Sequence, residues 1–512
     1  MFTAVKNISR LFTIARTLAR YDALWLLEEA GVAGSVVTAA RIVSKRNVEG
    51  RPGERIAQAL QELGPTFIKF GQALSTRSDL LGEEVAADLS ELQDHLPPFS
   101  AADARKIIEQ EMGQKVEESF SDFTWEPIAA ASIAQVHFAI TSEGEEVAVK
   151  VLRPNVEEAF AKDLALFHWI AHLVERARPE LRRLKPIEVI ETFEETIRLE
   201  MDLRLEAAAA QELAENFADD KAFRVPGVDW RRTTRRVLTL ERVSGIPIDE
   251  RDALIAAGHD PDEILVKAAS SLFKQVFRDG FFHADQHPGN LFVGEAGEIV
   301  AVDFGIMGRL DKPTRRYLGE MLMSFLNRDY RRVAEVHFEA GYVPADKSVQ
   351  AFTQACRSIA EPILDKPQNE ISIARLLAHL FQVTETFEME TQPQLLLLQK
   401  TMLTSEGVGR TLSPDANMWF LAQPLIEEWV EENMGPETMV MEAVGEVAEG
   451  LRRLPRIVSD MEKNAAAMAK GGLKLHPDTI RGMAGGERSS LVTSPKLYIG
   501  IIALLVVLLL IT

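Results

Sequence analysis

The sequence predicts a two-lobed α+β fold with an N-terminal helical extension and a C-terminal hydrophobic tail helix. Three features support this prediction: short strand-like segments between residues 125 and 152, long stretches with helical spacing on both sides of them, and a hairpin pattern at residues 291–302. The chain has 512 residues, of which 46% are hydrophobic and 26% are charged, which is typical of a globular protein with two or three domains.

Composition excludes several classes of function. The 57 basic and 77 acidic residues give a net charge of −20, which argues against a nucleic-acid partner because neutralising phosphates requires clustered Lys and Arg. The single cysteine, Cys356, excludes an intrachain disulfide and a Cys-rich zinc site, and it fits a reducing compartment. We expect Cys356 to be a thiol of the core without a chemical role.

The N-terminal segment is basic and has helical spacing. Lys6, Arg10, Arg16 and Arg20 interrupt its apolar residues, so it is not a secretory signal. The spacing predicts a helix docked on the protein, and a helix lying on anionic lipid or a transit peptide are the alternatives.

A second helix is predicted from Gly64 onward. Phe67 and Leu74 fall on its apolar face, whereas Lys69 and Gln72 fall on other faces, which periodicity alone indicates to be solvated. Within residues 101–123, the pattern predicts a further helix that ends near Gly113.

The next segment predicts a small sheet. Its strands are expected at Trp125–Ile128, Val136–Ile140 and Val147–Leu152, and the third carries Lys150. A lysine on the third strand of such a sheet is the kinase position that contacts the α- and β-phosphates of ATP, although a lone edge-strand lysine is weak support.

The first hairpin turn lacks glycine. It is a candidate nucleotide-covering loop consisting of Ile128, Ala129, Ala130, Ala131, Ser132, Ile133, Ala134, Gln135 and Val136. Alanine has poor access to positive φ and its methyl groups would crowd phosphates, so we expect altered nucleotide selectivity and poor ordinary kinase activity. An alanine-rich helical turn is the alternative.

Residues 155–217 predict long helices with a cluster of acids. One of Glu200, Asp202 and Glu206 should pair with Lys150, because an unpaired charge in a cleft is costly. Asp202 and Glu206 are four residues apart and would share a helix face, but the sequence does not decide which acid takes the lysine.

A connector and a helix lead to the next motif. After a strand at Val237–Leu240, Glu241 to Val243 would form the hinge whose backbone holds the adenine. Residues 261–279 predict an amphipathic helix that leads into the loop His283 to Asn290, which we call the catalytic loop.

The motif at residues 285–305 carries the chemistry. Asp285 is followed by Asn290, and a predicted hairpin of residues 291–302 returns Asp303-Phe304-Gly305 beside it. The pattern D-x-x-x-x-N followed by D-F-G is typical of protein-kinase-like phosphotransferases, in which the first Asp orients the attacking group and the Asn and second Asp bind Mg²⁺. After Gly305 there is no A-P-E, and Ala284 stands where kinases regulated by loop phosphorylation carry Arg, which argues against docking of an extended protein substrate.

The C-terminal end predicts membrane contact. Residues 451–496 hold nine basic and four acidic residues, and Leu497 to Ile511 form an uninterrupted apolar run of 15 residues. This uncharged apolar run favours a tail anchor over a hydrophobic docking tail. As a helix it would be roughly 22 Å long, which is shorter than the ~30 Å hydrocarbon core. The basic flank suits an anionic cytoplasmic leaflet.

Together, these motifs resemble the UbiB/ADCK atypical kinase-like family of ubiquinone biosynthesis over Leu63 to Arg309. The matching residues are Lys69 to Gln72 for K-x-G-Q, Glu200 to Asp202 for E-x-D, and His283 to Asn290 for H-x-D-x-H-P-G-N. The alanine-rich loop matches the family's replacement for the glycine-rich loop. The single apolar tail departs from bacterial relatives that carry two apolar segments.

The resemblance implies further properties. It implies that the K-x-G-Q helix folds over the active site and blocks protein substrates, and that ATP or ADP binds with Mg²⁺. It also implies ATPase action promoted by membrane lipid and ubiquinone-precursor-like phenols. The expected partners are anionic membrane lipid and ubiquinone-precursor lipids, with other ubiquinone-biosynthesis proteins and a homodimer as further candidates, at the bacterial inner membrane with the catalytic domain on the cytoplasmic side.

We therefore expect five segments: a helical extension at 1–120, a kinase-like N-lobe with inserted helices at 121–243, a C-lobe with helical additions at 244–445, a basic linker at 446–496 and a tail anchor at 497–512. Two alternatives are a non-catalytic nucleotide- and lipid-binding scaffold and a non-haem iron oxygenase. The latter would use His283, Asp285 and His287, two histidines and a carboxylate, but leaves Lys150 and the D-F-G motif unexplained.

Overall fold

The structure is a computed structural model. It describes residues 2–24, 50–75, 96–177, 186–363, 392–414 and 418–434, with isolated residues between 85 and 92 and between 379 and 389. The chain divides into two units, Met1–Met434 and Gly435–Thr512, and all described residues belong to the first. The predicted linker at 446–496 and tail anchor at 497–512 lie outside the described residues. Within the described ranges, no helix has the length and apolar character needed to cross a membrane.

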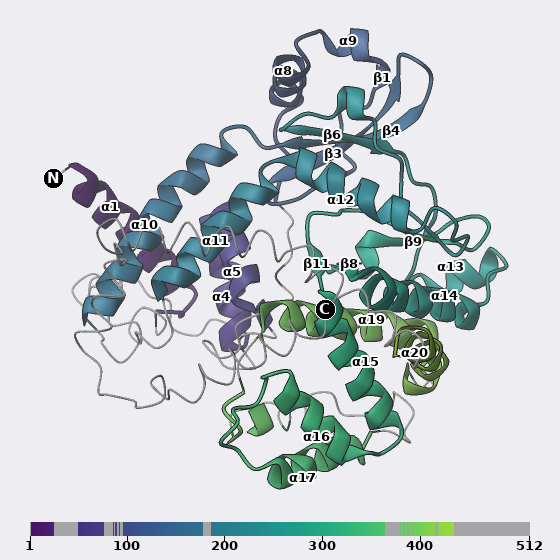
Figure 1. The fold of residues 1–512 in the computed structure, drawn as a ribbon. Coiled ribbons are helices and arrows are strands. Elements are labelled where there is room, and N and C mark those ends of the chain that lie inside the picture. The colour runs from purple at the N-terminus through teal and green to yellow at the C-terminus, as the bar shows by residue number, and fades with distance from the viewer. Residues whose placement is uncertain are drawn as a thin grey trace, which may run out of the picture. The chain divides into compact units, whose positions relative to one another are not determined.

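A five-stranded antiparallel sheet forms the core of the N-lobe (Figure 1). Its strands are β1 (Phe120–Phe123), β2 (Ala129–Ala130), β3 (Ala134–Thr141), β4 (Glu146–Leu152) and β6 (Val237–Glu241), in the order β1-β3-β4-β6 with β2 on β3. Along β4, Val147, Val149 and Val151 are buried in one cluster with the adjacent helix α8 (Ala101–Met112). Because side chains alternate along a strand, Lys150 faces the other side of the sheet.

The predicted strands at Val136–Ile140 and Val147–Leu152 are confirmed, whereas the strand predicted at Trp125–Ile128 is wrong. The first strand lies earlier, at Phe120–Phe123, after the short helix α9 (Val116–Ser119). Both phenylalanines are buried in the sheet core, and the Trp125 ring packs on Phe123 with centroids 4.5 Å apart. The aromatic residue at 125 therefore belongs to the core without belonging to a strand.

The N-terminal helices pack as a group with the helices inserted in the N-lobe. They are α1 (Phe2–Arg20), α4 (Pro52–Leu63), α5 (Pro65–Ser75), α10 (Val156–Ala177) and α11 (Pro186–Glu200), and one hydrophobic cluster includes buried side chains from all five. Helix α1 is docked as predicted, since Ile14, Ala15 and Leu18 are buried and Arg10 donates two hydrogen bonds to Asp163 on α10.

The C-lobe is built around a second sheet and a helical layer. Strands β5 (Phe223–Arg224), β10 (Ile299–Ala301), β9 (Leu291–Val293) and β7 (Ile246–Pro247) are neighbours in that order, and β8 (Phe281–His283) pairs with β11 (Met307–Arg309). The helices are α13 (Arg251–Ala256), α14 (Pro261–Phe273), the π-helix η3 (Lys274–Asp279), α15 (Lys312–Leu326), α16 (Tyr330–Glu339), α17 (Val349–Ala360), α19 (Pro393–Leu412) and α20 (Met418–Met434), together with the short 3₁₀ helix η4 (Pro288–Asn290). Helix α12 (Leu203–Asn216) contributes buried side chains to clusters of both lobes. The short 3₁₀ helix η2 (Trp230–Arg232) belongs to the N-lobe, where Arg232 donates to the Ser119 carbonyl.

The segment between β6 and β7 connects the two sheets, which is the position predicted for the hinge. The predicted helix at 261–279 is confirmed as α14 followed by η3, and it leads into β8 and the catalytic loop.

Candidate active site

A lysine and two acids from distant parts of the chain meet between the lobes. Lys150 Nζ, on β4, lies 2.8 and 3.0 Å from the two carboxylate oxygens of Glu206 on α12. It also lies 3.0 Å from Oδ1 of Asp303. Glu206 is therefore the acid that pairs with Lys150, a choice that the sequence left open.

The three charges perturb one another. Burial would lower the pKa of Lys150, but Asp303 and Glu206 together raise it above its usual value, so the ammonium is retained. Burial raises the pKa of Glu206 to about 7, with Lys150 opposing part of that shift. Burial by itself would raise the pKa of Asp303, but Lys150 and, more weakly, Lys69 hold this pKa well below its usual range. The side chain of Asp303 remains 47% exposed, so it can reach a ligand.

The prediction that Asp202 and Glu206 share a helix face is wrong. Helix α11 ends at Glu200 and α12 begins at Leu203, so Asp202 stands between them as the N-cap of α12. Its carboxylate accepts from the Arg204 backbone amide and pairs with the Arg204 side chain at 2.6 Å. A short acidic side chain satisfies the first amides of a helix better than it fits a helix interior, which explains the break.

The K-x-G-Q helix brings a second lysine to the acids. Lys69 Nζ, on α5, lies 3.1 Å from Oε2 of Glu200, and both side chains are only 12% exposed. The solvated face indicated by periodicity is therefore wrong for Lys69. Gln72 donates to the carbonyl of Leu92 at 3.4 Å. Among the described residues, α5 therefore contacts an acid of the site through Lys69 and not through Gln72.

The hairpin after the catalytic loop fixes the two predicted metal ligands. Strands β9 and β10 pair, and the Val302 amide donates to the Asn290 carbonyl at 2.9 Å, which places Asp303 next to Asn290. Asn290 is buried, and its Nδ2 donates to the Asp285 carbonyl at 3.0 Å. The φ of Asp303 is +61°, a conformation that costs free energy for a residue other than glycine and that persists mainly where function requires it.

Asn290 and Asp303 fit a magnesium ion by their chemistry. Carboxylate and amide oxygens are the hard ligands that Mg²⁺ prefers. The amide of Asn290 is oriented by its contact with the Asp285 backbone, and Asp303 is accessible and ionised. Among the described residues, no group of three or more His, Cys, Asp or Glu could hold a metal ion.

His283 organises the catalytic loop from a fully buried position. Its Nε2 donates to the Val302 carbonyl at 3.0 Å, and its Nδ1 accepts from the Asp285 amide at 3.2 Å. Burial lowers the pKa of His283, which favours the neutral ring that this pattern requires. Because both ring nitrogens are bound to backbone groups, His283 is not placed as a metal ligand, and the structure does not support the iron oxygenase alternative.

The alanine-rich loop is a tight hairpin turn, so the alternative of a helical turn is wrong. The Ala131 amide donates to the Ala134 carbonyl at 2.8 Å, and β2 pairs with β3 on either side of the turn. The Arg153 guanidinium links the loop to a preceding segment, because it donates to the carbonyls of Ala131 and Pro97. Ser132 is fully buried in this turn.

The predicted hinge residues have different surroundings. The Glu241 amide donates to the Gly227 carbonyl at 2.8 Å, and its carboxylate pairs with Arg224. The Glu241 amide is therefore already bonded within the protein, and an adenine contact of the connector stays a prediction.

Sequence reasoning missed one charged neighbour of Asp285. Lys400 Nζ, on α19, lies 3.4 Å from Oδ1 of Asp285, and Nε2 of His287 lies 3.8 Å from Oδ2. Lys400 is an ordinary lysine on a helix 115 residues away, and nothing in its local sequence marks it.

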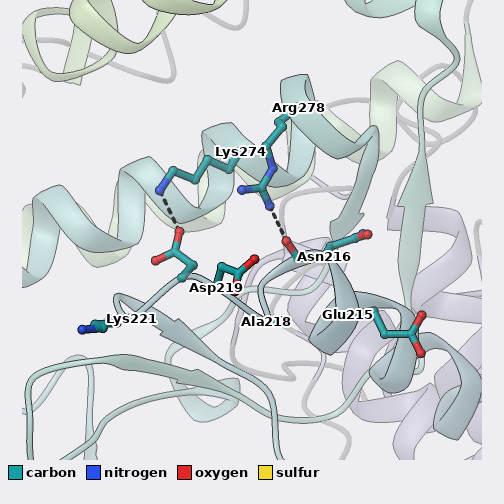
Figure 2. Close-up of a pocket in the computed structure, with 8 residues that line it drawn as sticks. Glu215, Asn216, Ala218, Asp219, Lys221, Lys274 and Arg278 are labelled. Atoms are coloured by element: carbon teal, nitrogen blue, oxygen red, sulfur yellow. Dashed lines mark hydrogen bonds and ion pairs between the residues drawn. The ribbon is translucent and has the colours of Figure 1, made fainter.

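A polar depression of about 420 Å³ lies elsewhere, between the end of α12 and the helix α14–η3 (Figure 2). Lys274 pairs with Asp220 at 2.7 Å and Arg278 donates to the Asn216 carbonyl at 2.7 Å, so both of these cations are bound within the protein. Neither Lys150 nor Asp303 lines it, and we do not assign it to the active site.

Comparison with known families finds two matches. Residues 91–337 match the ABC1 atypical kinase-like domain, and residues 356–417 match the UbiB helical domain. The first contains the lysine and the acids of the site, and the second contains Lys400.

Curated proteins named "Probable protein kinase UbiB" are similar over most of the chain. The protein from Marinobacter nauticus is 44% identical over 415 residues, which cover 80% of this chain and 76% of that protein. The proteins from Azotobacter vinelandii and Pseudomonas aeruginosa PAO1 are 44% and 45% identical, covering 81% and 78% of this chain and 78% and 76% of those proteins.

A solved structure is also similar. It is described as the complex of Rv3197 with erythromycin, from Mycobacterium tuberculosis, and it is 26% identical with a TM-score of 0.51. The match covers 77% of this chain and 98% of that one. The likeness supports a shared kinase-like fold.

Proposed function

Because this chain belongs to the UbiB family of ABC1 atypical kinase-like proteins, we propose that it is a membrane-associated, ATP-dependent phosphotransferase or ATPase that supports ubiquinone biosynthesis. The observation that carries this proposal is the bridge from Lys150 to Glu206 and Asp303, which joins the N-lobe sheet to the D-F-G segment. The pair of Lys150 with Glu206 corresponds to the lysine–glutamate ion pair on which phosphoryl transfer in protein kinases depends, and Asp303 corresponds to the acid that binds Mg²⁺ in them.

Each residue has a role in this proposal. Lys150, held by Glu206, would contact the α- and β-phosphates of ATP, and the alanine-rich loop would cover them. Asn290 and Asp303 would hold Mg²⁺, which supplies charge neutralisation between the phosphates. Asp285, whose backbone amide and carbonyl are fixed by His283 and Asn290, would orient the attacking oxygen.

The chemical step needs no covalent intermediate on the protein. The attacking oxygen of water or a small-molecule hydroxyl forms a bond to the γ-phosphorus while the bond to the β,γ-bridging oxygen breaks. ADP leaves with the electron pair, and the proton of the attacking group passes to the Asp285 carboxylate.

The position of α5 supports a small or lipid acceptor. Lys69 is paired with Glu200 at the edge of the site and contributes to the low pKa of Asp303, so α5 occupies space near the metal ligands. A protein substrate would have to displace this helix. We therefore propose action on, or presentation of, lipid intermediates, with anionic membrane lipid as a partner of the basic and apolar C-terminal segments.

Phosphate release by the full chain tests the proposal. We expect Mg²⁺-dependent release from ATP that increases with anionic liposomes and is lost in Asp303→Ala. Asp220→Asn, which removes an acid that lines the polar depression at the end of α12, should keep wild-type release and is the matched control. Nucleotide binding in a thermal-shift assay without phosphate release would instead indicate a nucleotide- and lipid-binding scaffold.

A second experiment addresses the biological role. A deletion strain complemented with Asp285→Asn should accumulate ubiquinone precursors in a quinone profile. Full rescue of ubiquinone by this variant would contradict a catalytic role and favour the scaffold.

A further inference from the structure

Helix α19 is attached to the catalytic loop on both sides of Asp285. Thr401 Oγ1 lies 3.2 Å from the Ala284 carbonyl and shares its proton between this carbonyl and that of Leu397 on its own helix, at 2.8 Å. Ser405 Oγ donates to Oε1 of Gln286 at 3.3 Å. Thr401 is fully buried, and Leu398 on the same helix belongs to a cluster with Ala284. These contacts set the register of α19 against the loop.

That register places Lys400 beside the catalytic aspartate. Its side chain is 33% exposed and that of Asp285 is 28% exposed, so the ammonium is partly sheltered but accessible. The separation of 3.4 Å is longer than the 2.7–2.9 Å typical of a strong charge-assisted hydrogen bond. An ammonium has three donors and no acceptor, so Lys400 can contact a second anion beside Asp285.

The catalytic loop itself supplies no permanent cation at this position. The four residues between Asp285 and Asn290 are Gln-His-Pro-Gly, without Lys or Arg. Lys150 is engaged by Glu206 and Asp303, on the metal side of the site. The γ-phosphoryl group has three equatorial oxygens whose charge must be neutralised during transfer, and these oxygens lie in the plane between the attacking and the leaving oxygen. A cation beside the residue that orients the attacking oxygen is within reach of one of them.

We propose that Lys400 binds one of the equatorial γ-phosphoryl oxygens beside Asp285 and stabilises its charge during transfer, while Asp285 orients the attacking oxygen. This inference rests on the proposed function and deepens it. Atoms and charges balance as in the step above: the oxygen to γ-phosphorus bond forms, the bond to the bridging oxygen breaks, ADP takes the electron pair, Asp285 takes the proton, and Lys400 keeps its own protons.

The inference gives the helical domain a chemical role. Residues 356–417 match the UbiB helical domain, separate from the match to the kinase-like domain at 91–337. If Lys400 belongs to the site, the kinase-like domain is incomplete without α19.

The test compares Lys400→Ala and Lys400→Arg with Lys274→Ala in the full chain. Lys274 is the matched control because it is 37% exposed and pairs with Asp220 at 2.7 Å, away from the catalytic loop. Steady-state phosphate release gives kcat and KM for ATP. Isothermal titration gives the Kd of MgADP with and without aluminium fluoride, which imitates the phosphoryl group in transfer.

We expect Lys400→Ala to lower kcat by about 10- to 100-fold, the range of one charge-assisted hydrogen bond, with KM changed by less than about threefold. The tightening of MgADP by aluminium fluoride should fall by a similar factor, while the Kd of MgADP alone stays the same. Lys400→Arg should recover part of both effects, and Lys274→Ala should match the wild type.

Three results would overturn the inference. If Lys400→Ala keeps the wild-type kcat and the aluminium fluoride effect, Lys400 has no part in the reaction and the proposed function stands without it. If the variant raises KM and weakens MgADP alone while kcat is unchanged, the lysine is only a structural contact of α19. If the wild type shows neither phosphate release nor tightening by aluminium fluoride, the proposed function fails together with the inference.

Discussion

The ion pair between Lys69 and Glu200 should show strong energetic coupling. Its atoms are 3.1 Å apart, both side chains are 12% exposed, and Oε2 of Glu200 is fully buried with no hydrogen bond from any other described residue. Removing one partner of a buried pair costs about 3–5 kcal/mol, because the other charge is left without compensation. Since this pair is nearly but not completely buried, and since Lys69 also interacts with Asp303, we expect about 2–3 kcal/mol for Lys69→Met and no more than that for Glu200→Gln.

The double variant should be less destabilised than the two single changes added together. Replacing both charges removes the uncompensated group, so the double variant should cost no more than either single one, which corresponds to a coupling energy of about 2 kcal/mol. Differential scanning calorimetry measures this as a change in Tm, where 1 kcal/mol corresponds to about 1 °C in a unit of this size. Lys69→Met should therefore lower Tm by roughly 2–3 °C.

A surface pair provides the control for this cycle. Arg331 and Glu335 are 2.9 Å apart on α16, but their side chains are 81% and 35% exposed, so their coupling should be about 0.3–0.5 kcal/mol. If the Lys69 and Glu200 effects add, or if their coupling is as small as that of the control, then α5 is not held by this pair and our reasoning about it is refuted.

Three further predictions concern other parts of the chain. Arg153→Lys cannot reproduce the two hydrogen bonds to the Ala131 carbonyl, so amides of the alanine-rich loop should exchange with deuterium about 10-fold faster, and unchanged exchange contradicts this. Burial lowers the pKa of His137, whose Nε2 accepts from Gln135, so the unfolded state binds more protons than the folded state below pH 6.5. As the pH is lowered, Tm should therefore fall, and the free energy of unfolding should decrease by up to about 1.4 kcal/mol per pH unit more than in His137→Gln. Equal pH dependence of both proteins would exclude this. Burial raises the pKa of Cys356 to about 12, so this thiol should react with an aromatic disulfide reagent at pH 8 only after unfolding, and reaction in the native state would show that it is accessible.

Much of the site could be predicted because its motifs lie on regular local structure. The alternating valines of β4 predicted the strand that carries Lys150, and the two apolar runs after Asn290 predicted the hairpin that returns Asp303. In both cases a period of two along the chain fixes which side chains share a face, so local sequence was sufficient.

The acids and the missed lysine depend on tertiary structure. From the periodicity we predicted that Glu200 to Glu206 lie in one helix. In the structure, α11 ends at Glu200 and Asp202 caps α12. This break changes the direction of the following residues, and Glu206 is the acid that meets Lys150. Lys400 reaches Asp285 only because Thr401 and its neighbours pack on the catalytic loop, and no local pattern encodes such a contact.

The first strand shows a similar limit. The aromatic residues between 120 and 125 all pack in the N-lobe core, so composition alone did not decide which of them lie in the strand. The pairing of β1 with β3 made that choice, with Phe123 opposite Ala139.

The central claim is that Lys150, Asn290 and Asp303 form one metal–nucleotide site. Electron paramagnetic resonance of Mn²⁺ titrated into the full chain with ADP tests it directly. We predict one bound Mn²⁺ per chain that requires ADP, with affinity reduced at least about 10-fold in Asp303→Ala and in Asn290→Ala but unchanged in Asp220→Asn. A bound ion that does not require ADP, or that is unaffected by loss of Asp303, would contradict the claim.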